Sequence, residues 1–265
     1  MSMSKQRTLG ISLQEVQFRL VQKLNNLKDQ VYGQRAFGMS NEELDPRHSY
    51  VREVNLFLES AELDDIRKRY FTSFQVQEET KRMLLKDFEQ NTDRHFSAAE
   101  RIIKKKFSIL GHADLYFGNE IDWKFDPINK VHSPQIYWSK INYLDFGECG
   151  DHKVIWELNR HQHFITLGKA YWITGDEKYA QEWVDQTCHW ILSNPPKTGI
   201  NWASSLEVAF RSIAWIWAFL FFQSSKKVDY EFWQKYFYVL YINGLHIEKN
   251  LSYYFSPNTH LTGEA

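Results

Sequence analysis

The chain has 265 residues, of which 43% are hydrophobic and 25% are charged, and its 32 basic and 33 acidic residues give a formal charge of −1. The mean hydropathy is −0.52, and the longest apolar run, Ile213 to Phe222, is about half as long as a bilayer crossing, which argues against a membrane span. The balanced charge lacks the basic excess of a nucleic-acid binder. It also argues weakly against a heavily sulfated ligand held mainly by charge.

The composition favours long helices and an aromatic-rich fold. Only 12 glycines and 6 prolines interrupt the chain, whereas 10 Trp, 14 Tyr and 19 Phe make up 16% of it. Such rings pack between helices, and they also stack on the apolar faces of sugar rings, so carbohydrate is a candidate ligand. Cys149 and Cys188 lack the CxxC spacing of a zinc knuckle, and we expect both to be reduced and buried.

Residues 1–110 are predicted to form a helical N-terminal region. Apolar residues at three- and four-residue spacings predict an amphipathic helix over residues 12–39. Residues 41–108 are charge-rich and mostly helical in pattern. The cluster Lys104-Lys105-Lys106 is interpreted as a solvated helix face, with a polyanion contact as the alternative.

Residues 111–151 differ in character, because turn residues recur and aromatic side chains crowd together, Trp138 among them. This pattern indicates a long irregular segment lying over a helical body. Long loops of this kind are usually functional.

The last third of the chain predicts four helices in succession. They are expected over residues 154–174, 176–193, 204–222 and 229–250, the third being apolar almost all round and therefore buried. Gly175 is expected to end the first and Asp176 to cap the second. Short turns between long helices favour stacked antiparallel pairs, as in an α/α barrel or solenoid.

The first group of candidate site residues is Glu-Leu-Asn-Arg-His-Gln-His at 157–163. His161 and His163 are two apart on a predicted helix and point to opposite sides, so no metal site is expected. Asn159 and His163 share a side, with Arg160 beside them. The cluster either lines a cleft or forms a satisfied buried network.

Two further groups follow. In residues 199–211, Ser204 and Glu207 have the spacing of a capping box, and Glu207 and Arg211 form a predicted ion pair on an apolar helix. Residues 250–261 place an amide, a hydroxyl and an imidazole at a helix junction, although Ser-Pro-Asn is also ordinary turn chemistry.

Taken together, WELNRHQH (156–163), WASSLEVAFR (202–211) and SPNTHLTGEA (256–265) resemble the N-terminal domain of the heparinase II/III family of polysaccharide lyases. The resemblance covers about residues 120–265. It implies an all-α fold, an incomplete α/α toroid, with residues 111–265 continuous with the helical region before them. The family's C-terminal β-sandwich is absent from this sequence, and the chain ends where a new helix is expected, so we expect a longer protein.

The resemblance implies cleavage of uronic-acid-containing glycans by β-elimination. Such an enzyme stabilises the enolate that forms when the C5 proton leaves, and it needs an acid and a base. Asn258 is the candidate partner of the uronate carboxylate, with His260 beside it, while Thr259 stands where the family often has a second Asn. The family's catalytic tyrosine and a further histidine lie downstream, so we expect this fragment alone to be inactive.

The resemblance further assigns substrate binding to eight residues: Asn159, Arg160, His161, Asn201, Trp202, Glu207, Arg211 and Trp138. No cofactor or metal is expected. The expected partner is an acidic polysaccharide of the alginate, heparan or bacterial exopolysaccharide type, not nucleic acid. The family implies a periplasmic or secreted location, while the lack of a recognisable signal peptide leaves a cytoplasmic one open. The alternatives are a non-catalytic carbohydrate-binding or scaffold module and a purely structural α/α domain.

Overall fold

The computed structural model describes residues 12–32, 37, 39–40, 43–60, 66, 77–254 and 258–265. The fold is all-α, and short 3-10 helices, η2 (Trp138–Lys140) and η3 (Ile200–Trp202), connect some of its elements. The α-helices are α1 (Leu13–Tyr32), α2 (Ser49–Ser60), α5 (Gln77–Ile103), α6 (Phe146–Cys149), α7 (His152–Asn159), α8 (His163–Thr174), α9 (Glu177–Ser193), α10 (Ser205–Phe222), α11 (Tyr230–Lys249) and α12 (Thr259–Glu264).

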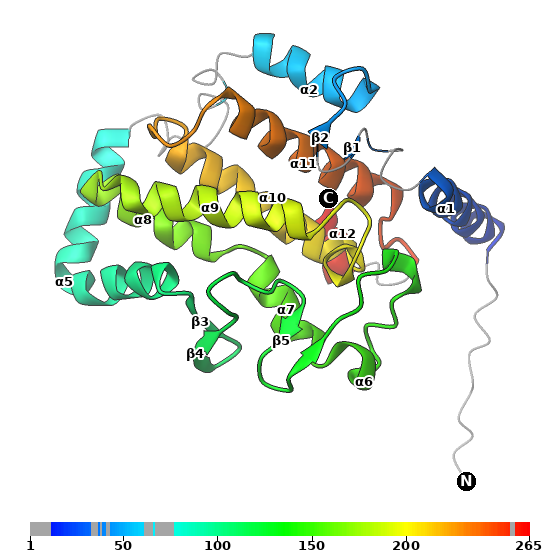
Figure 1. The fold of residues 1–265 in the computed structure, drawn as a ribbon, viewed down its shortest axis with the longest axis horizontal. Coiled ribbons are helices and arrows are strands. Elements are labelled where there is room, and N and C mark those ends of the chain that lie inside the picture. Colours follow the sequence, from blue (N-terminus) through cyan, green and yellow to red (C-terminus); the bar gives the residue numbers. More distant parts are fainter. Residues whose placement is uncertain are drawn as a thin grey trace.

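The strands within the described residues form three small antiparallel pairs. They are β1 (Met39–Ser40) with β2 (Glu43–Leu44), β3 (Lys106–Ile109) with β4 (His112–Tyr116), and β5 (Phe125–Asp126) with β6 (Val131–His132). In the β3–β4 hairpin, Lys106 lies opposite Tyr116 and Ile109 opposite His112. The hairpin projects from the helical body next to α7 (Figure 1).

The long helices pack side by side in a toroid-like arc (Figure 1). Helix α10 lies between α8 and α11, α5 and α9 pack on α8, and α2 covers α11. In the described chain, α10 is the one helix long and apolar enough to cross a membrane by length and composition, and 67% of it is buried inside the protein. The apolar surface of α10 is therefore core, as its sequence pattern predicts.

Aromatic rings fill this core. Trp183 stacks on Phe222 with ring centroids 4.5 Å apart, and Trp215 stacks on Tyr236 at 4.6 Å. All four side chains are fully buried. Most of the tryptophans therefore hold helices together. Only the few aromatic rings that reach a surface are available to contact a sugar.

Local signals set the ends of the predicted helices. Gly175 ends α8 with a φ of +67°, in the left-handed region that glycine favours. Asp176 caps α9 by accepting a hydrogen bond from the backbone N–H of Lys178 at 3.0 Å. Asp229 caps α11 through the N–H of Phe232 at 2.8 Å. The predicted boundaries of α9, α10 and α11 are confirmed to within a few residues.

The predicted single helix over residues 154–174 is wrong. The chain breaks between α7 and α8, and His161 adopts a φ of +57°. The His161 ring is fully buried, stacks on Phe164 at 4.6 Å and accepts a hydrogen bond from the indole of Trp215 at 2.7 Å. These tertiary contacts hold the histidine in an unfavourable backbone conformation.

Three other boundaries differ from the sequence-based expectations. Helix α1 ends at Tyr32, before the predicted residue 39, and the last helix begins at Thr259, earlier than expected. The basic cluster is not a helix face, since Lys104 and Lys105 form a turn after α5 and Lys106 begins β3.

Candidate functional site

A cleft of about 600 Å³ opens where the three sequence groups meet. We refer to it as the main cleft. Its walls come from α1, the tip of the β3–β4 hairpin, the irregular segment, α7, the start of α10 and the segment from α11 to α12. Its lining includes Trp138, Tyr143, His152, Trp156, Glu157, Arg160, Ser204, Ser205, Glu207, Asn250, Ser252 and His260.

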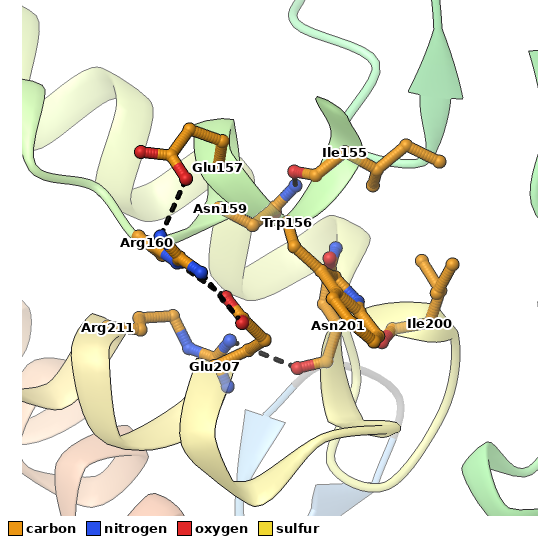
Figure 2. A network of polar contacts seen from close by, with 9 residues as sticks. All are labelled: Ile155, Trp156, Glu157, Asn159, Arg160, Ile200, Asn201, Glu207 and Arg211. Atoms are coloured by element: carbon orange, nitrogen blue, oxygen red, sulfur yellow. Dashed lines mark hydrogen bonds and ion pairs between the residues drawn. The ribbon is translucent and has the colours of Figure 1, made fainter. Parts of the chain in front are cut away.

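Arg160 lies at the centre of a charged clamp in this cleft (Figure 2). Its Nε and Nη2 donate to the two carboxylate oxygens of Glu207 at 2.6 and 2.9 Å, and its Nη1 donates to Glu157 at 2.6 Å. The bond to Glu207 raises the pKa of Arg160 above its usual value, so the guanidinium stays charged. Two carboxylates offset this single cation, which fixes the cleft wall and leaves it without excess positive charge.

The local pairing predicted for Glu207 is wrong in both respects. Ser204 is the N-terminal cap residue of α10, but its side chain makes no capping hydrogen bond among the described residues. The Glu207 carboxylate instead pairs with Arg160, 47 residues earlier (Figure 2), and it forms no direct ion pair with Arg211 in the described part of the chain. A bidentate bond to a guanidinium is stronger than a bond to a backbone N–H, which explains why the long-range partner wins.

Arg211 lies beneath the cleft and is fully buried. Its Nη1 donates to the Asn201 carbonyl at 3.0 Å and its Nη2 to Asn243 Oδ1 at 3.3 Å. The guanidinium also sits over the ring of Trp190 at 4.5 Å and that of Trp202 at 5.4 Å. Burial lowers the pKa of Arg211 to about 9. This residue joins α10, α11 and η3, and it is not among the residues that line the cleft.

Asn159 and Asn201 form a second buried network. Both side-chain amides donate to the Trp123 carbonyl, at 2.9 and 3.1 Å respectively. The Asn159 carbonyl oxygen accepts from the Trp190 indole at 2.8 Å, and Asn201 also donates to Asn194 at 2.8 Å. The two amides therefore tie the irregular segment to the helices.

Of the two interpretations of residues 157–163, the buried network applies to Asn159 and His161, and the cleft applies to Arg160. Trp202 is likewise buried, with 1% exposure. Five of the eight predicted substrate-binding residues are thus buried and do not line the cleft, and three line it: Trp138, Arg160 and Glu207.

The sequence analysis missed an aromatic corner of the cleft. The rings of Tyr143, His152 and Trp156 lie 4.6–5.4 Å apart. The Trp156 indole donates to the Ile200 carbonyl at 3.0 Å, which orients the ring. Burial lowers the pKa of His152, so its imidazole is neutral at neutral pH. The aromatic crowding of residues 111–151 was the available signal, but it did not single out Tyr143.

The third sequence group reaches the cleft through Asn250, Leu251, Ser252 and His260, whereas Asn258 is not among the lining residues. Asn258 is exposed at the N-terminal cap of α12, where its backbone carbonyl accepts hydrogen bonds from Thr262. Glu264 fixes this helix, because its carboxylate accepts from the N–H and the hydroxyl of Ser252 at 2.7 and 2.6 Å. Residues 255–257 lie outside the described part of the chain, within which no His, Cys, Asp and Glu side chains gather as metal ligands do.

Comparisons with known proteins show similarity to lyases. Heparin-sulfate lyases from Bacteroides stercoris and Bacteroides thetaiotaomicron are 35% identical over 79 residues and 48% identical over 58 residues. These segments cover 30% and 21% of this chain but only 9% and 8% of the two lyases.

The crystal structure of a heparan sulfate lyase HepC mutant from Pedobacter heparinus superposes with a TM-score of 0.52 at 19% identity. The match covers 87% of this chain and 34% of that structure, so the chain spans about a third of its structural relative. A likeness at this identity shows the all-α fold. A model of the Heparinase II/III N-terminus family matches residues 41–265, which include the three sequence groups that form the cleft. The chain belongs to the heparinase II/III N-terminus family.

Proposed function

We propose that this chain is the N-terminal part of a lyase that cleaves a uronic-acid-containing glycosaminoglycan by β-elimination. The observation that carries the proposal is that three sequence groups far apart in the chain meet in one cleft. Arg160, Glu207 and His260 each come from a different group and line the same walls. The family and the names of the relatives, heparin-sulfate lyases, support this chemistry and substrate class.

In the proposed reaction, a base removes the C5 proton of the uronate, and the electrons of the C–H bond form the C4=C5 double bond. The bond from C4 to the leaving oxygen breaks, and that oxygen takes up a proton. Charge develops on the carboxylate as an enolate, so hydrogen-bond donors near it accelerate the step. We assign this role to the Asn258 amide and the His260 imidazole at the start of α12.

Trp138 and the aromatic corner together provide the sugar platform in this proposal. Trp138 and Trp156 both line the cleft, and the Trp156 ring is held by its bond to Ile200. The clamp of Arg160 keeps α7 and α10 at a fixed separation, which preorganises the cleft. Heparan-type chains are the favoured substrate because of the relatives, and we place the complete protein in the periplasm or outside the cell, where it meets such chains.

The test uses the protein at the length found in its native source, with heparan sulfate as substrate. Elimination produces an unsaturated uronate whose ultraviolet absorbance reports turnover. Asn258→Ala and His260→Ala should each lower kcat by about 10²–10⁴-fold with little change in KM. The control is His132→Gln, which changes an exposed histidine on β6 and should leave turnover intact.

Unchanged turnover in both variants would remove this segment from the mechanism. Saturable binding of heparan sulfate with no absorbance change would instead favour the non-catalytic carbohydrate-binding module.

A further inference from the structure

A second hollow of about 360 Å³, here called the hairpin groove, lies beside the main cleft. Its walls are the end of α5, strand β3 and the residues on either side of the break between α7 and α8. Polar side chains in it include Arg101, Lys106, Ser108, Glu157 and Gln162. No role has been assigned to it so far in the proposed reaction.

The hairpin groove adjoins the main cleft. Glu157 lines both hollows, and Ile109 lines the groove while the next residue, Leu110, lines the cleft. The tip of the β3–β4 hairpin and α7 are therefore a shared border. The two hollows are neighbours that share this wall.

Two cations, Arg101 and Lys106, line the groove, whereas the main cleft is lined by Arg160 and Lys153. Arg101 donates to Ser108 at 2.7 Å and pairs with Asp114 at 2.8 Å, so its guanidinium is held in place. Lys106 is exposed and has no ion-pair partner within the described residues. Glu157, the carboxylate in the groove, is already bonded to Arg160.

Asp114 offsets the charge of Arg101, and the other titratable groups near the groove leave the charge of Lys106 uncompensated. Burial lowers the pKa of His163 to about 4, so this imidazole is neutral, and it is bonded to Gln186 at 2.8 Å. Of the three consecutive lysines, Lys105 turns inward to pair with Glu182, and Lys104 is exposed outside the groove lining. Lys106 is the member of the cluster that faces the groove.

We propose that the hairpin groove is a second glycan subsite, which binds sulfate or carboxylate groups of the anionic chain whose neighbouring sugars occupy the main cleft. Lys106 and Arg101 are its specificity-determining residues. This inference rests on the proposed function, because it assumes a polyanionic glycan in the main cleft. It makes affinity depend on chain length, since a short oligosaccharide fills the cleft alone and a longer one reaches both hollows.

The experiment compares Lys106→Gln with Lys104→Gln in this chain. The two variants lose the same charge from neighbouring exposed positions, and only the first changes the groove. Binding of a heparin-derived disaccharide and octasaccharide is followed by tryptophan fluorescence at low salt. Lys106→Gln should weaken octasaccharide binding about fivefold, the effect of one exposed ion pair of about 1 kcal/mol, and leave disaccharide binding unchanged. Added salt should reduce the difference.

Lys104→Gln should bind both oligosaccharides as the unchanged protein does, and Arg101→Gln should behave like Lys106→Gln. Equal losses in the Lys104 and Lys106 variants would overturn the subsite and leave the proposed function standing. An equal loss for both oligosaccharides in Lys106→Gln would also overturn it, because that residue would then act on the main cleft. Failure of the unchanged protein to bind either oligosaccharide would contradict the proposed function itself, and with it this inference.

Discussion

Replacing Glu207 with Gln tests whether the Arg160 clamp holds the cleft walls together. The variant keeps the shape of the side chain but removes the charge that meets the Arg160 guanidinium at 2.6 and 2.9 Å. The Glu207 side chain is 7% exposed and that of Arg160 is 24% exposed. The pair is therefore largely shielded from water, and its loss leaves a cation with one remaining carboxylate, that of Glu157.

The expected cost follows from this burial. Breaking a fully buried ion pair costs about 3–5 kcal/mol. Because Arg160 is partly exposed and keeps Glu157, we expect the free energy of unfolding to fall by about 2–3 kcal/mol, measured by urea denaturation.

The control is Glu231→Gln, which breaks an exposed pair on α11. Glu231 and Lys235 lie 2.7 Å apart with side chains 73% and 40% exposed, so this change should cost about 0.3–0.5 kcal/mol. Equal losses in the two variants would refute the reasoning, since the clamp would then contribute no more than a surface pair.

Two further predictions concern packing and pH. In Gly168→Ala the new Cβ would lie 2.5 Å from the Phe221 ring. This clash forces α8 and α10 apart and should lower the free energy of unfolding by about 1–3 kcal/mol in urea denaturation. The control Gly244→Ala, whose Cβ meets no neighbouring atom within 4 Å, should be neutral or stabilising by up to about 1 kcal/mol, and equal effects of the two changes would contradict the packing argument. Burial lowers the pKa of Lys197 to about 7. Above that pH the unfolded chain keeps a proton on this lysine that the folded protein has lost. The free energy of unfolding should therefore rise with pH up to the ordinary lysine pKa of about 10.4. Lys197→Met should flatten this rise, and an unchanged slope would show that Lys197 does not cause it.

The parts of the fold that follow from local chemistry were predictable from sequence. Asp176 and Asp229 cap their helices with their own side chains, and Gly175 supplies the left-handed residue that ends α8. The break at His161 was not predictable in this way. It depends on stacking with Phe164 and on a hydrogen bond from Trp215, 54 residues later.

In the candidate site, too, some features follow from the local sequence and others depend on contacts between distant residues. The three sequence groups identified the region of the main cleft, because burying polar or charged side chains in apolar helices costs free energy unless they have partners. Which residues face the cleft depends on partners far along the chain. The amides of Asn159 and Asn201 bind the Trp123 carbonyl, and no local spacing reveals that bond. Overall charge balance likewise concealed the local position of Lys106 in the hairpin groove.

The most direct test of the central claim is the mass of the oligosaccharides that the protein, at its native length, produces from heparan sulfate. Elimination conserves the total mass of the fragments and leaves a double bond, because no water enters the products. Hydrolysis adds one water to each cleavage. The account predicts fragments whose masses sum to that of the substrate, one of them ending in an unsaturated uronate. Fragments that together weigh one water more would contradict a lyase built around this cleft.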